Sequence, residues 1–329
     1  MIDDRIAARR RAMFAAAFGP EIEAALADPA VTDILLNPDG VLRIERSGEP
    51  LRETSHRIDA VQAERIIRLV AAHLDVEASP HHPILSADLP VHADGRAGER
   101  FEAVLPPVAT APCFAIRVPA VRDLKLTDYA EAGIMTPDAA RLLSLAVVER
   151  RNILIAGGTG SGKTTLANAL LAEMTASHER VILIEDTREL QSPVRDTVAL
   201  RTRTGAVSMA DLVRSALRLR PDRIIVGEVR GGEALDLLKA WNTGHPGGLA
   251  TVHANGSRAA LYRLEQLVQE CIAAVPRRLI ADAVDIIAFF SGRGPARRLT
   301  SLARVQGLTA SGDYALEELL SPPCNGDLK

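Results

Sequence analysis

The sequence predicts an α/β protein in which a smaller α+β domain is followed by a larger domain built on a mostly parallel sheet. The chain has 329 residues, enough for two separate hydrophobic cores. From Asn152 onward, short apolar runs alternate with amphipathic helical stretches, which is the pattern of a parallel sheet covered on both faces. The first 118 residues mix helical and alternating segments without that regular order, as an α+β domain does.

Two boundaries divide the chain. Residues 1–118 are the expected N-terminal domain, 119–135 a connector, and 136–329 the α/β domain. The connector is expected because Pro119, Gly133 and a run of mixed charges interrupt the apolar periodicity.

The expected elements follow from periodicity and from turn residues such as Pro38-Asp39-Gly40. In the N-terminal domain, helices are expected over 4–27 and 57–74, and strands over 31–37, 41–45, 101–105 and 114–118. In the second domain, a helix begins at Thr136-Pro137 and runs towards Glu149. Further strands are expected over 152–156, 181–185, 223–227, 249–252 and 284–290, helices over 163–176, 208–219, 232–242 and 257–273, and a closing hairpin over 299–305 and 314–319.

Composition excludes several classes of protein. The hydrophobic share of 47% and the charged share of 25% are those of an ordinary globular protein. The net charge of −3 argues against a protein that coats nucleic acid. The three cysteines, Cys113, Cys271 and Cys324, are scattered and odd in number, which predicts neither a disulfide framework nor a metal site and fits a reducing cytosol. No apolar run approaches the ~20 residues of a membrane span, so any membrane association is expected to be peripheral.

A glycine-rich loop lies between an apolar strand and a helix and satisfies the phosphate-loop pattern G-x-x-x-x-G-K-[ST]. Its glycines let the backbone aim N–H groups at a phosphate chain, and the helix N-terminus adds partial positive charge. Lys163 is expected to meet the β- and γ-phosphates of ATP, and the Thr164 hydroxyl to ligate Mg²⁺. A turn with an incidental lysine is the alternative, and it is disfavoured because the chain has only four lysines. The expected nucleotide-binding residues are Gly157, Gly158, Thr159, Gly160, Ser161, Gly162, Lys163, Thr164 and Thr165.

A second apolar strand, 223–227, ends next to Glu228. Gly227 stands where most phosphate-loop proteins carry a magnesium-binding aspartate. We expect Glu228 to orient and polarise an attacking water, from a strand that neighbours the loop strand. The alternative is a surface glutamate that only caps the strand.

A carboxylate cluster follows the strand 181–185. Glu185, Asp186 and Glu189 are expected at the same sheet edge, where they would position Mg²⁺ waters in place of the missing aspartate. The alternative is an acidic loop that caps helices or pairs with arginines.

Another short strand leads from a glycine-containing loop, 243–248, to His253. A histidine at this strand end is expected to sense the γ-phosphate and to transmit its loss to the next helix. The alternative is a structural histidine.

Four segments in this order, 157–165, 184–189, 220–230 and 243–255, resemble the four sequence boxes of the secretion ATPase superfamily of type II secretion, type IV secretion and type IV pili. The N-terminal half is similar to the type IV secretion branch, and the chain is most similar to the TrbB family of conjugal-transfer ATPases. The N-terminal residues that carry this similarity are Pro83-Ile84-Leu85, Asp88-Leu89-Pro90, Arg100, Pro106-Pro107 and Ala115-Ile116-Arg117.

The resemblance implies a RecA-like P-loop ATPase core, a homo-hexameric ring and ATP with Mg²⁺ between the two domains of each subunit. It also implies that Arg100 and Arg117 reach the phosphates, although both would also be ordinary in an arginine-rich chain. The expected place of action is cytoplasmic, peripheral at the inner membrane, with inner-membrane components of a secretion or conjugation apparatus as partners.

The resemblance implies a ring ATPase that powers assembly or transport by a conjugative type IV secretion system, in mating-pair formation or pilus biogenesis. Three alternatives stay open: a nucleic-acid-translocating RecA-like motor, a type IV pilus or type II secretion ATPase, and a nucleotide-operated scaffold with negligible turnover. The net charge of −3 counts against the first, so no obligatory nucleic acid is expected. The four metal-ligand cysteines usual in type II secretion ATPases are not present, and Glu228 counts against the scaffold.

Overall fold

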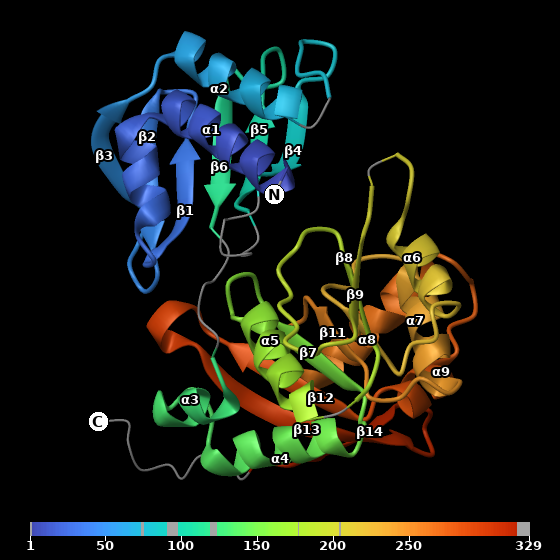
Figure 1. Ribbon diagram of the computed structural model, residues 1–329. Coiled ribbons are helices and arrows are strands. Elements are labelled where there is room, and N and C mark those ends of the chain that lie inside the picture. The colour runs from blue at the N-terminus through green and yellow to red at the C-terminus, as the bar shows by residue number, and fades with distance from the viewer. Residues whose placement is uncertain are drawn as a thin grey trace. The chain divides into compact units, whose positions relative to one another are not determined.

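A computed structural model describes residues 2–73, 76–90, 98–118, 124–176, 178–203 and 205–320. The chain forms two compact units, Met1–Val121 and Arg122–Lys329 (Figure 1). Each unit contains its own sheet and its own buried apolar cluster or clusters. The expected mixed α/β fold is confirmed.

The N-terminal unit is an antiparallel sheet of six strands in the order β3-β2-β1-β6-β5-β4. Its helices and strands are α1 (Ile2–Ala27), β1 (Val31–Leu36), β2 (Val41–Arg46), β3 (Arg52–Arg57), α2 (Ala60–His73), β4 (Ile84–Asp88), β5 (Arg100–Val104) and β6 (Cys113–Arg117). The helices α1 and α2 cover one face of the sheet (Figure 1).

The alternation of apolar and polar residues along its strands decides which face of this sheet is buried. In β5, Phe101 and Ala103 are buried against the helices, whereas Arg100 and Glu102 lie on the other face. The strand β3 was not expected from the sequence, because none of its six residues is buried and it lies at the sheet edge.

The segment expected to be a connector, 119–135, has a different role in its second half. Residues 119–123 lie outside the described residues. The helix α3 (Leu126–Glu131) belongs to the C-terminal unit, because Leu126 and Tyr129 are buried in that unit's core together with Met135. Mixed charges on the exposed side of this short helix hid its buried residues from the sequence analysis.

The C-terminal unit has an eight-stranded sheet in the order β14-β13-β12-β7-β11-β10-β8-β9. The six strands from β12 to β9 are parallel, and β13 and β14 add an antiparallel hairpin. The strands are β7 (Ile153–Gly157), β8 (Val181–Glu185), β9 (Thr197–Arg201), β10 (Arg223–Val226), β11 (Leu249–Val252), β12 (Ile286–Ser291), β13 (Arg298–Leu308) and β14 (Tyr314–Glu318). The helices are α3, α4 (Pro137–Val148), α5 (Lys163–Glu173), α6 (Met209–Ala216), α7 (Glu233–Asn242), α8 (Ser257–Gln269) and α9 (Arg277–Ala283), with short 3₁₀ turns at Met174–Ala176 and Gly294–Ala296.

Two apolar clusters cover the two faces of this sheet. Ile153 and Ile155 of β7 belong to one cluster with α3, α4 and α5, whereas Leu154 and Ala156 belong to the other with α6 to α9. Successive residues of a strand point to opposite faces, so a fully buried strand must be apolar throughout. This is why β7, β8, β10 and β11 could be predicted almost to the residue.

Candidate nucleotide-binding site

The phosphate loop connects the end of β7 to the start of α5 as the sequence predicts. Gly160 and Gly162 have φ angles of 72° and 93°, which other residues rarely adopt. A methyl group at Gly157 would lie 2.5 Å from Ser161 Oγ and 2.8 Å from the carbonyl oxygen of Phe290. The loop backbone therefore closes tightly on itself, with the N-terminus of α5 at its end.

Lys163 is the first residue of α5 and is buried. Its Nζ donates to the carbonyl oxygens of Gly157 and Gly158 at 3.2 and 3.0 Å. The ammonium group thus folds back over the loop and places a positive charge within the curve of the backbone. This is the position from which a lysine can meet phosphate oxygens.

Glu228 follows β10, but β10 is not a neighbour of the loop strand. The strand β11 pairs with both β7 and β10, so it lies between them. The expectation that Glu228 lies on a strand next to β7 is therefore wrong. The alternation of strands and helices in the sequence predicts that the strands are parallel, but it does not specify the order of the strands in the sheet.

The intervening strand β11 ends just before His253, which makes close contact with Glu228. His253 Nε2 lies 2.7 Å from Glu228 Oε1. The pKa of His253 is lowered, first by burial and then by the positive charge of Lys163, while Glu228 acts to raise it. A neutral imidazole is therefore favoured near pH 7. The influence of Lys163 shows that the histidine and the phosphate loop share one electrostatic environment.

Arg230 is a residue of this site that the sequence analysis did not select. Its Nη2 donates to Glu228 Oε2 at 2.5 Å, and its Nη1 lies 3.8 Å from Asp186 Oδ2. The backbone N–H of Arg230 donates to Glu233 Oε1, which fixes the turn into α7. The spacing Glu228-x-Arg230 after a strand was a usable signal, since residues two apart on extended backbone point to the same side.

Glu185 is the buried member of the carboxylate set. Burial raises its pKa to about 7, although its Oε1 accepts the backbone N–H groups of Glu189 and Leu190 at 2.9 and 2.7 Å. Its side chain lies against Gly227, where a methyl group would be 3.1 Å from Glu185 Cγ. Glu185 thus occupies the space that an aspartate at position 227 would need.

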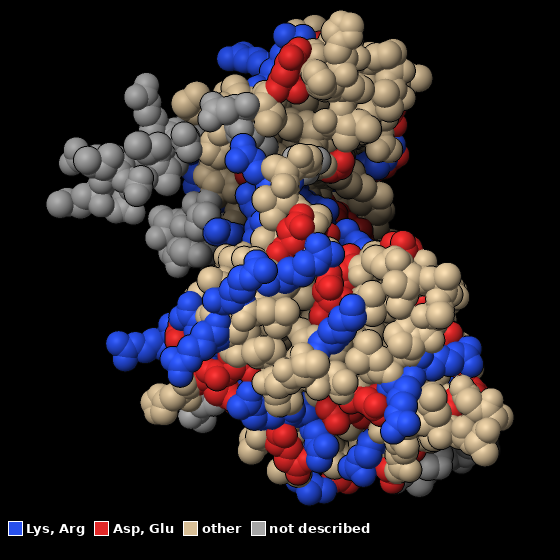
Figure 2. Space-filling view, turned by 90° about the vertical axis from the view of Figure 1, so that its right-hand side faces the viewer, with Lys and Arg blue, Asp and Glu red and all other residues tan. Residues whose placement is uncertain are grey.

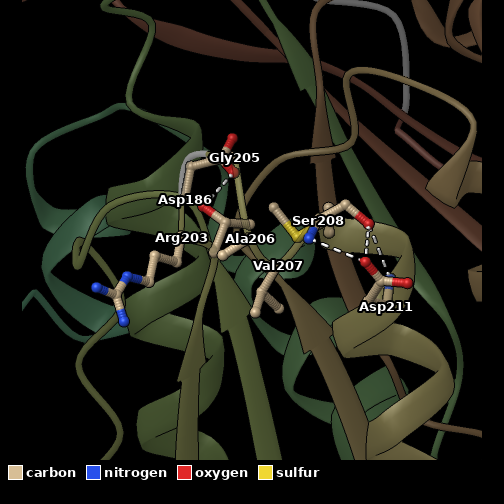
Figure 3. A pocket seen from close by; sticks show the side chains of 9 residues that line it. Asp186, Arg203, Gly205, Ala206, Val207, Ser208 and Asp211 are labelled. Atoms are coloured by element: carbon tan, nitrogen blue, oxygen red, sulfur yellow. Dashed lines mark hydrogen bonds between the residues drawn. The ribbon is translucent and has the colours of Figure 1, made fainter.

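The side chains of the other two carboxylates make contacts of their own. Glu189 Oε2 accepts a hydrogen bond of 3.0 Å from Thr164 Oγ1 at the phosphate loop. Asp186 instead accepts from Thr202 Oγ1 at 3.0 Å and faces an open pocket of about 420 Å³ (Figure 3). Within the described ranges, no three His, Cys, Asp or Glu residues group closely enough to hold a metal ion. The three carboxylates make different contacts, and their role in positioning Mg²⁺ waters stays a prediction.

A magnesium ion beside a nucleotide usually takes only one or two protein ligands, the rest being phosphate and water oxygens. The Thr164 hydroxyl and the Glu189 carboxylate, already in contact, fit that requirement. The pocket beside Asp186 is lined by both polar and apolar residues, and two of its polar groups bond each other: Ser208 Oγ donates to Asp211 Oδ2 at 2.6 Å. In Figure 3 the side chain of Arg203 points away from the other labelled residues.

The loop 243–248 precedes β11 and therefore lies at the end of the sheet opposite to His253, which follows β11. The N–H of Gly248 donates to Asn152 Oδ1 at 2.9 Å, and a side chain at Gly248 would collide with Trp241. His245 Nδ1 lies 3.0 Å from the carbonyl oxygen of Pro221. These residues of the motif pack the fold and do not contact the phosphate loop.

The two arginines of the N-terminal unit lie side by side in that unit's own sheet. Arg100 of β5 is directly opposite Arg117 of β6, and Asp88 and Asp33 are the next partners in the same row. The row is on the face opposite the buried Phe101. The strand register therefore places two guanidinium groups close together between two aspartates.

No helix among the described residues is both long and apolar enough to cross a bilayer.

Comparison with known proteins gives consistent results along most of the chain. The family described as "Type II/IV secretion system protein" matches residues 21–290. The conjugal transfer protein TrbB of Rhizobium radiobacter is 45% identical over 291 residues, which is 88% of each chain. The type IV secretion system protein PtlH of Bordetella pertussis is 33% identical over 85% of this chain and 92% of its own.

Two solved structures have a similar fold. The pilus retraction motor PilT with bound ADP superposes with a TM-score of 0.62 at 19% identity, over 93% of this chain and 83% of its own. The ATPase DotB of Legionella pneumophila gives 0.60 at 20% identity, over 90% and 78%. Their low identity makes these a likeness of fold, whereas the family match and the relatives above 30% identity extend over most of the sequence. The resemblance read from the sequence is therefore confirmed, and the chain belongs to the type II/IV secretion system protein family.

Proposed function

We propose that this protein is an ATP hydrolase that forms a homo-hexameric ring and powers assembly or transport by a conjugative type IV secretion system. Relatives named for conjugal transfer match it at 45% identity over most of their length, which supports the conjugative branch. The observation that carries hydrolysis is the contact of Glu228 with His253, two strands from a phosphate loop with a buried lysine.

ATP binding rests on the loop and on α5. The first N–H groups of α5 and the Lys163 ammonium hold the phosphate chain, whose negative charge the helix N-terminus also favours. Thr164 and Glu189 are the residues that would hold Mg²⁺. When bound, the ion neutralises charge on the β- and γ-phosphate oxygens.

Glu228 supplies the base. A water oxygen attacks the γ-phosphorus, the bond from that phosphorus to the β-phosphate oxygen breaks, and the water proton moves towards the Glu228 carboxylate. ADP and inorganic phosphate leave. Arg230 donates to one carboxylate oxygen, and His253 Nε2 lies 2.7 Å from the other, so the carboxylate is kept at the carboxyl ends of the strands. The positive charge of Lys163 lowers the pKa of His253, and α8 begins shortly after this histidine. His253 is therefore placed to transmit the loss of the γ-phosphate to α8.

The N-terminal unit contributes Arg100 and Arg117. Two arginines directly opposite each other repel, and the flanking Asp33 and Asp88 offset this repulsion in the absence of a nucleotide. A triphosphate would be a better partner. Cations that arrive from a separate unit couple phosphate chemistry to movement of that unit, which a motor requires.

Lys163→Ala tests the nucleotide site. Removing the loop cation should abolish measurable ATP hydrolysis and most ATP affinity, measured by phosphate release and by calorimetry.

Light scattering of the wild type with ATP and Mg²⁺ should show a particle of about six subunits. Normal turnover in the variant would refute the site, and a monomer under all nucleotide conditions would refute the ring.

Arg117→Ala tests the contribution of the N-terminal unit. Turnover should fall on the order of 10²-fold if Arg117 stabilises the transferring phosphoryl group, while ring size stays the same. Arg52→Ala is the matched control, because Arg52 lies in the edge strand β3 and pairs with Glu49. Equal turnover in both variants would leave the N-terminal unit as a docking surface only.

A nucleic-acid-translocating motor finds less support. The face of the C-terminal unit in Figure 2 carries acidic and basic side chains interspersed. Some exposed arginines of this unit pair with acids, as Arg214 does with Asp236 and Arg180 with Asp196. A backbone track for nucleic acid needs uncompensated positive charge.

A further inference from the structure

A second loop of the C-terminal unit lies against the phosphate loop from the side away from Glu228. The strand β12 pairs in parallel with β7, and its Phe290 is the register partner of Gly157. The chain after β12 therefore leaves the sheet beside the phosphate loop. This segment, 292–297, connects β12 to β13, and we call it the β12–β13 loop.

The β12–β13 loop has a fixed shape. Gly292 has a φ of 75°, and a side chain there would collide with the backbone of Ala296. Arg298 Nη1 donates to the carbonyl oxygens of Pro295 and Arg297, both at 2.7 Å. Gly292 and the two hydrogen bonds of Arg298 Nη1 together hold the loop so that Arg297 faces the phosphate loop.

The side chain of Arg297 lies on Gly162, the residue just before α5. A methyl group at Gly162 would be 2.8 Å from both Cδ and Nη1 of Arg297. Only glycine at this position lets the guanidinium approach the helix N-terminus so closely. Gly162 thus has two reasons to be glycine: its φ of 93° and the arginine beside it.

The hydrogen-bonding groups of the Arg297 guanidinium are not all satisfied by the described part of the protein. Arg297 Nε is buried without a hydrogen-bond partner in the described part of the chain, and within those ranges the side chain has no ion pair with an acid. Ser161 Oγ and the Tyr129 hydroxyl are also buried without partners there. The pKa of Tyr129 is raised by burial, against an opposing effect of the Arg297 charge, which shows that these two side chains are near each other. Burying polar groups in this way costs free energy unless a ligand completes them.

We propose that Arg297 is a nucleotide-binding residue that contacts the phosphate oxygens shared by ATP and ADP. This rests on the proposed nucleotide site. The strand order places β12 on one side of β7, and β11 and β10 on the other. The γ-phosphate must lie on the side of Glu228, so a cation on the opposite side meets the inner part of the phosphate chain. Arg297 therefore raises affinity for both nucleotides and does not act on the rate of the chemical step.

The experiment compares Arg297→Met and Arg297→Lys with the wild type. Methionine keeps an apolar stem against Gly162 but has no charge, so it separates packing from electrostatics. Arg297→Met should bind ATP, ADP and inorganic pyrophosphate about tenfold or more weakly, by similar factors, because a charge-assisted hydrogen bond is lost. Turnover at saturating ATP should stay within about threefold. Arg297→Lys should recover part of the affinity.

Arg304→Met is the matched control, since Arg304 lies on β13 in an exposed ion pair with Glu317. It should bind nucleotides as the wild type does. Unchanged affinities in Arg297→Met, or a fall in turnover at saturating ATP with affinity kept, would overturn the proposal. Thermal unfolding without nucleotide checks that the variants are folded. A wild type that binds no nucleotide would instead refute the nucleotide site itself, so the two failures are distinct.

Discussion

The two ends of the parallel strands in the C-terminal sheet differ in how some of their buried polar side chains are bonded, although Arg150 Nε, just before β7, is also buried without a partner in the described part of the chain. At the edge where β7 and β11 begin, Asn152 donates from Nδ2 to the carbonyl oxygen of Ala283 at 2.8 Å and accepts from the N–H of Gly248 at 2.9 Å. At the edge where they end, Ser161 Oγ and Arg297 Nε are buried and find no partner in the described part of the chain. We call the side of the sheet where the parallel strands begin the starting edge, and the side where they end the finishing edge. Neither name refers to the outermost strands of the sheet.

The comparison separates residues that hold the fold from residues that await a ligand. Buried polar groups in folded proteins are nearly always hydrogen-bonded, so the exceptions call for an explanation. The starting edge has its buried amide satisfied on both sides by backbone. The finishing edge keeps donors open beside a helix N-terminus, where phosphate binds. One sequence motif, 243–255, has residues at both edges and therefore has both roles.

Glu228→Gln at the finishing edge should lower turnover far more than any substitution at the starting edge. The amide keeps the shape of the carboxylate and some of its contacts with His253 and Arg230, but it cannot accept a proton from water. Turnover should fall by about 10²- to 10⁴-fold, with ATP affinity retained. Single-turnover phosphate release and calorimetric ATP titration measure the two quantities. Lost ATP binding would mean that Glu228 holds the metal and not the water.

Gly248→Ala at the starting edge should act on stability alone. The added methyl would collide with the Trp241 indole and lie 2.8 Å from the carbonyl oxygen of Ile224. Overpacking of this kind costs about 1–3 kcal/mol, so the thermal midpoint should drop while turnover per folded molecule stays normal.

Gly256→Ala provides the control for that substitution, because its added methyl would meet nothing within 4 Å. Because Gly256 is the N-cap of α8, where alanine is less favourable than glycine, the thermal midpoint of Gly256→Ala should fall only slightly and by less than that of Gly248→Ala. A specific loss of turnover in Gly248→Ala, with no loss of stability, would break the division between the two edges.

The sequence predicted the parts of this unit that depend on local pattern. Fully buried strands are continuous apolar runs, and β8 and β11 have the bounds expected for them. The edge strand β9 was missed because none of its residues is fully buried, so its pattern is weak. The helix α9 was missed because it is only seven residues long.

The residues of the site could be predicted only where they belong to a local sequence motif. The phosphate loop, Glu228 and His253 each follow a strand, and the ends of parallel strands meet at one edge. The position of β11 between β7 and β10 is a property of the whole sheet, and no local pattern encodes it. Arg297 approaches Gly162 only because β12 pairs with β7. Such contacts between distant segments require the fold.

Glu185→Gln tests whether a buried carboxylate at the finishing edge costs stability. Burial raises the pKa of Glu185 to about 7 from an ordinary value of 4.5. The folded protein therefore binds more protons than the unfolded chain between these two pH values, and the contribution of Glu185 to stability is lost as pH rises through 7. Glutamine has no such titration, and its oxygen can still accept the N–H groups of Glu189 and Leu190.

The unfolding free energy of Glu185→Gln, relative to the wild type, should thus increase from pH 5 to pH 7, with a slope on the order of 1 kcal/mol per pH unit, and level off above pH 7. Urea unfolding at several pH values measures it. Glu64→Gln removes one carboxylate from an exposed position on α2, where Glu64 pairs with Arg68, and its difference from the wild type should stay nearly constant. Parallel profiles for Glu185→Gln and the wild type would mean that Glu185 is ionised in the folded protein. The finishing edge would then hold a buried charge stabilised by the two backbone N–H groups, and Glu185 would resemble the satisfied residues of the starting edge.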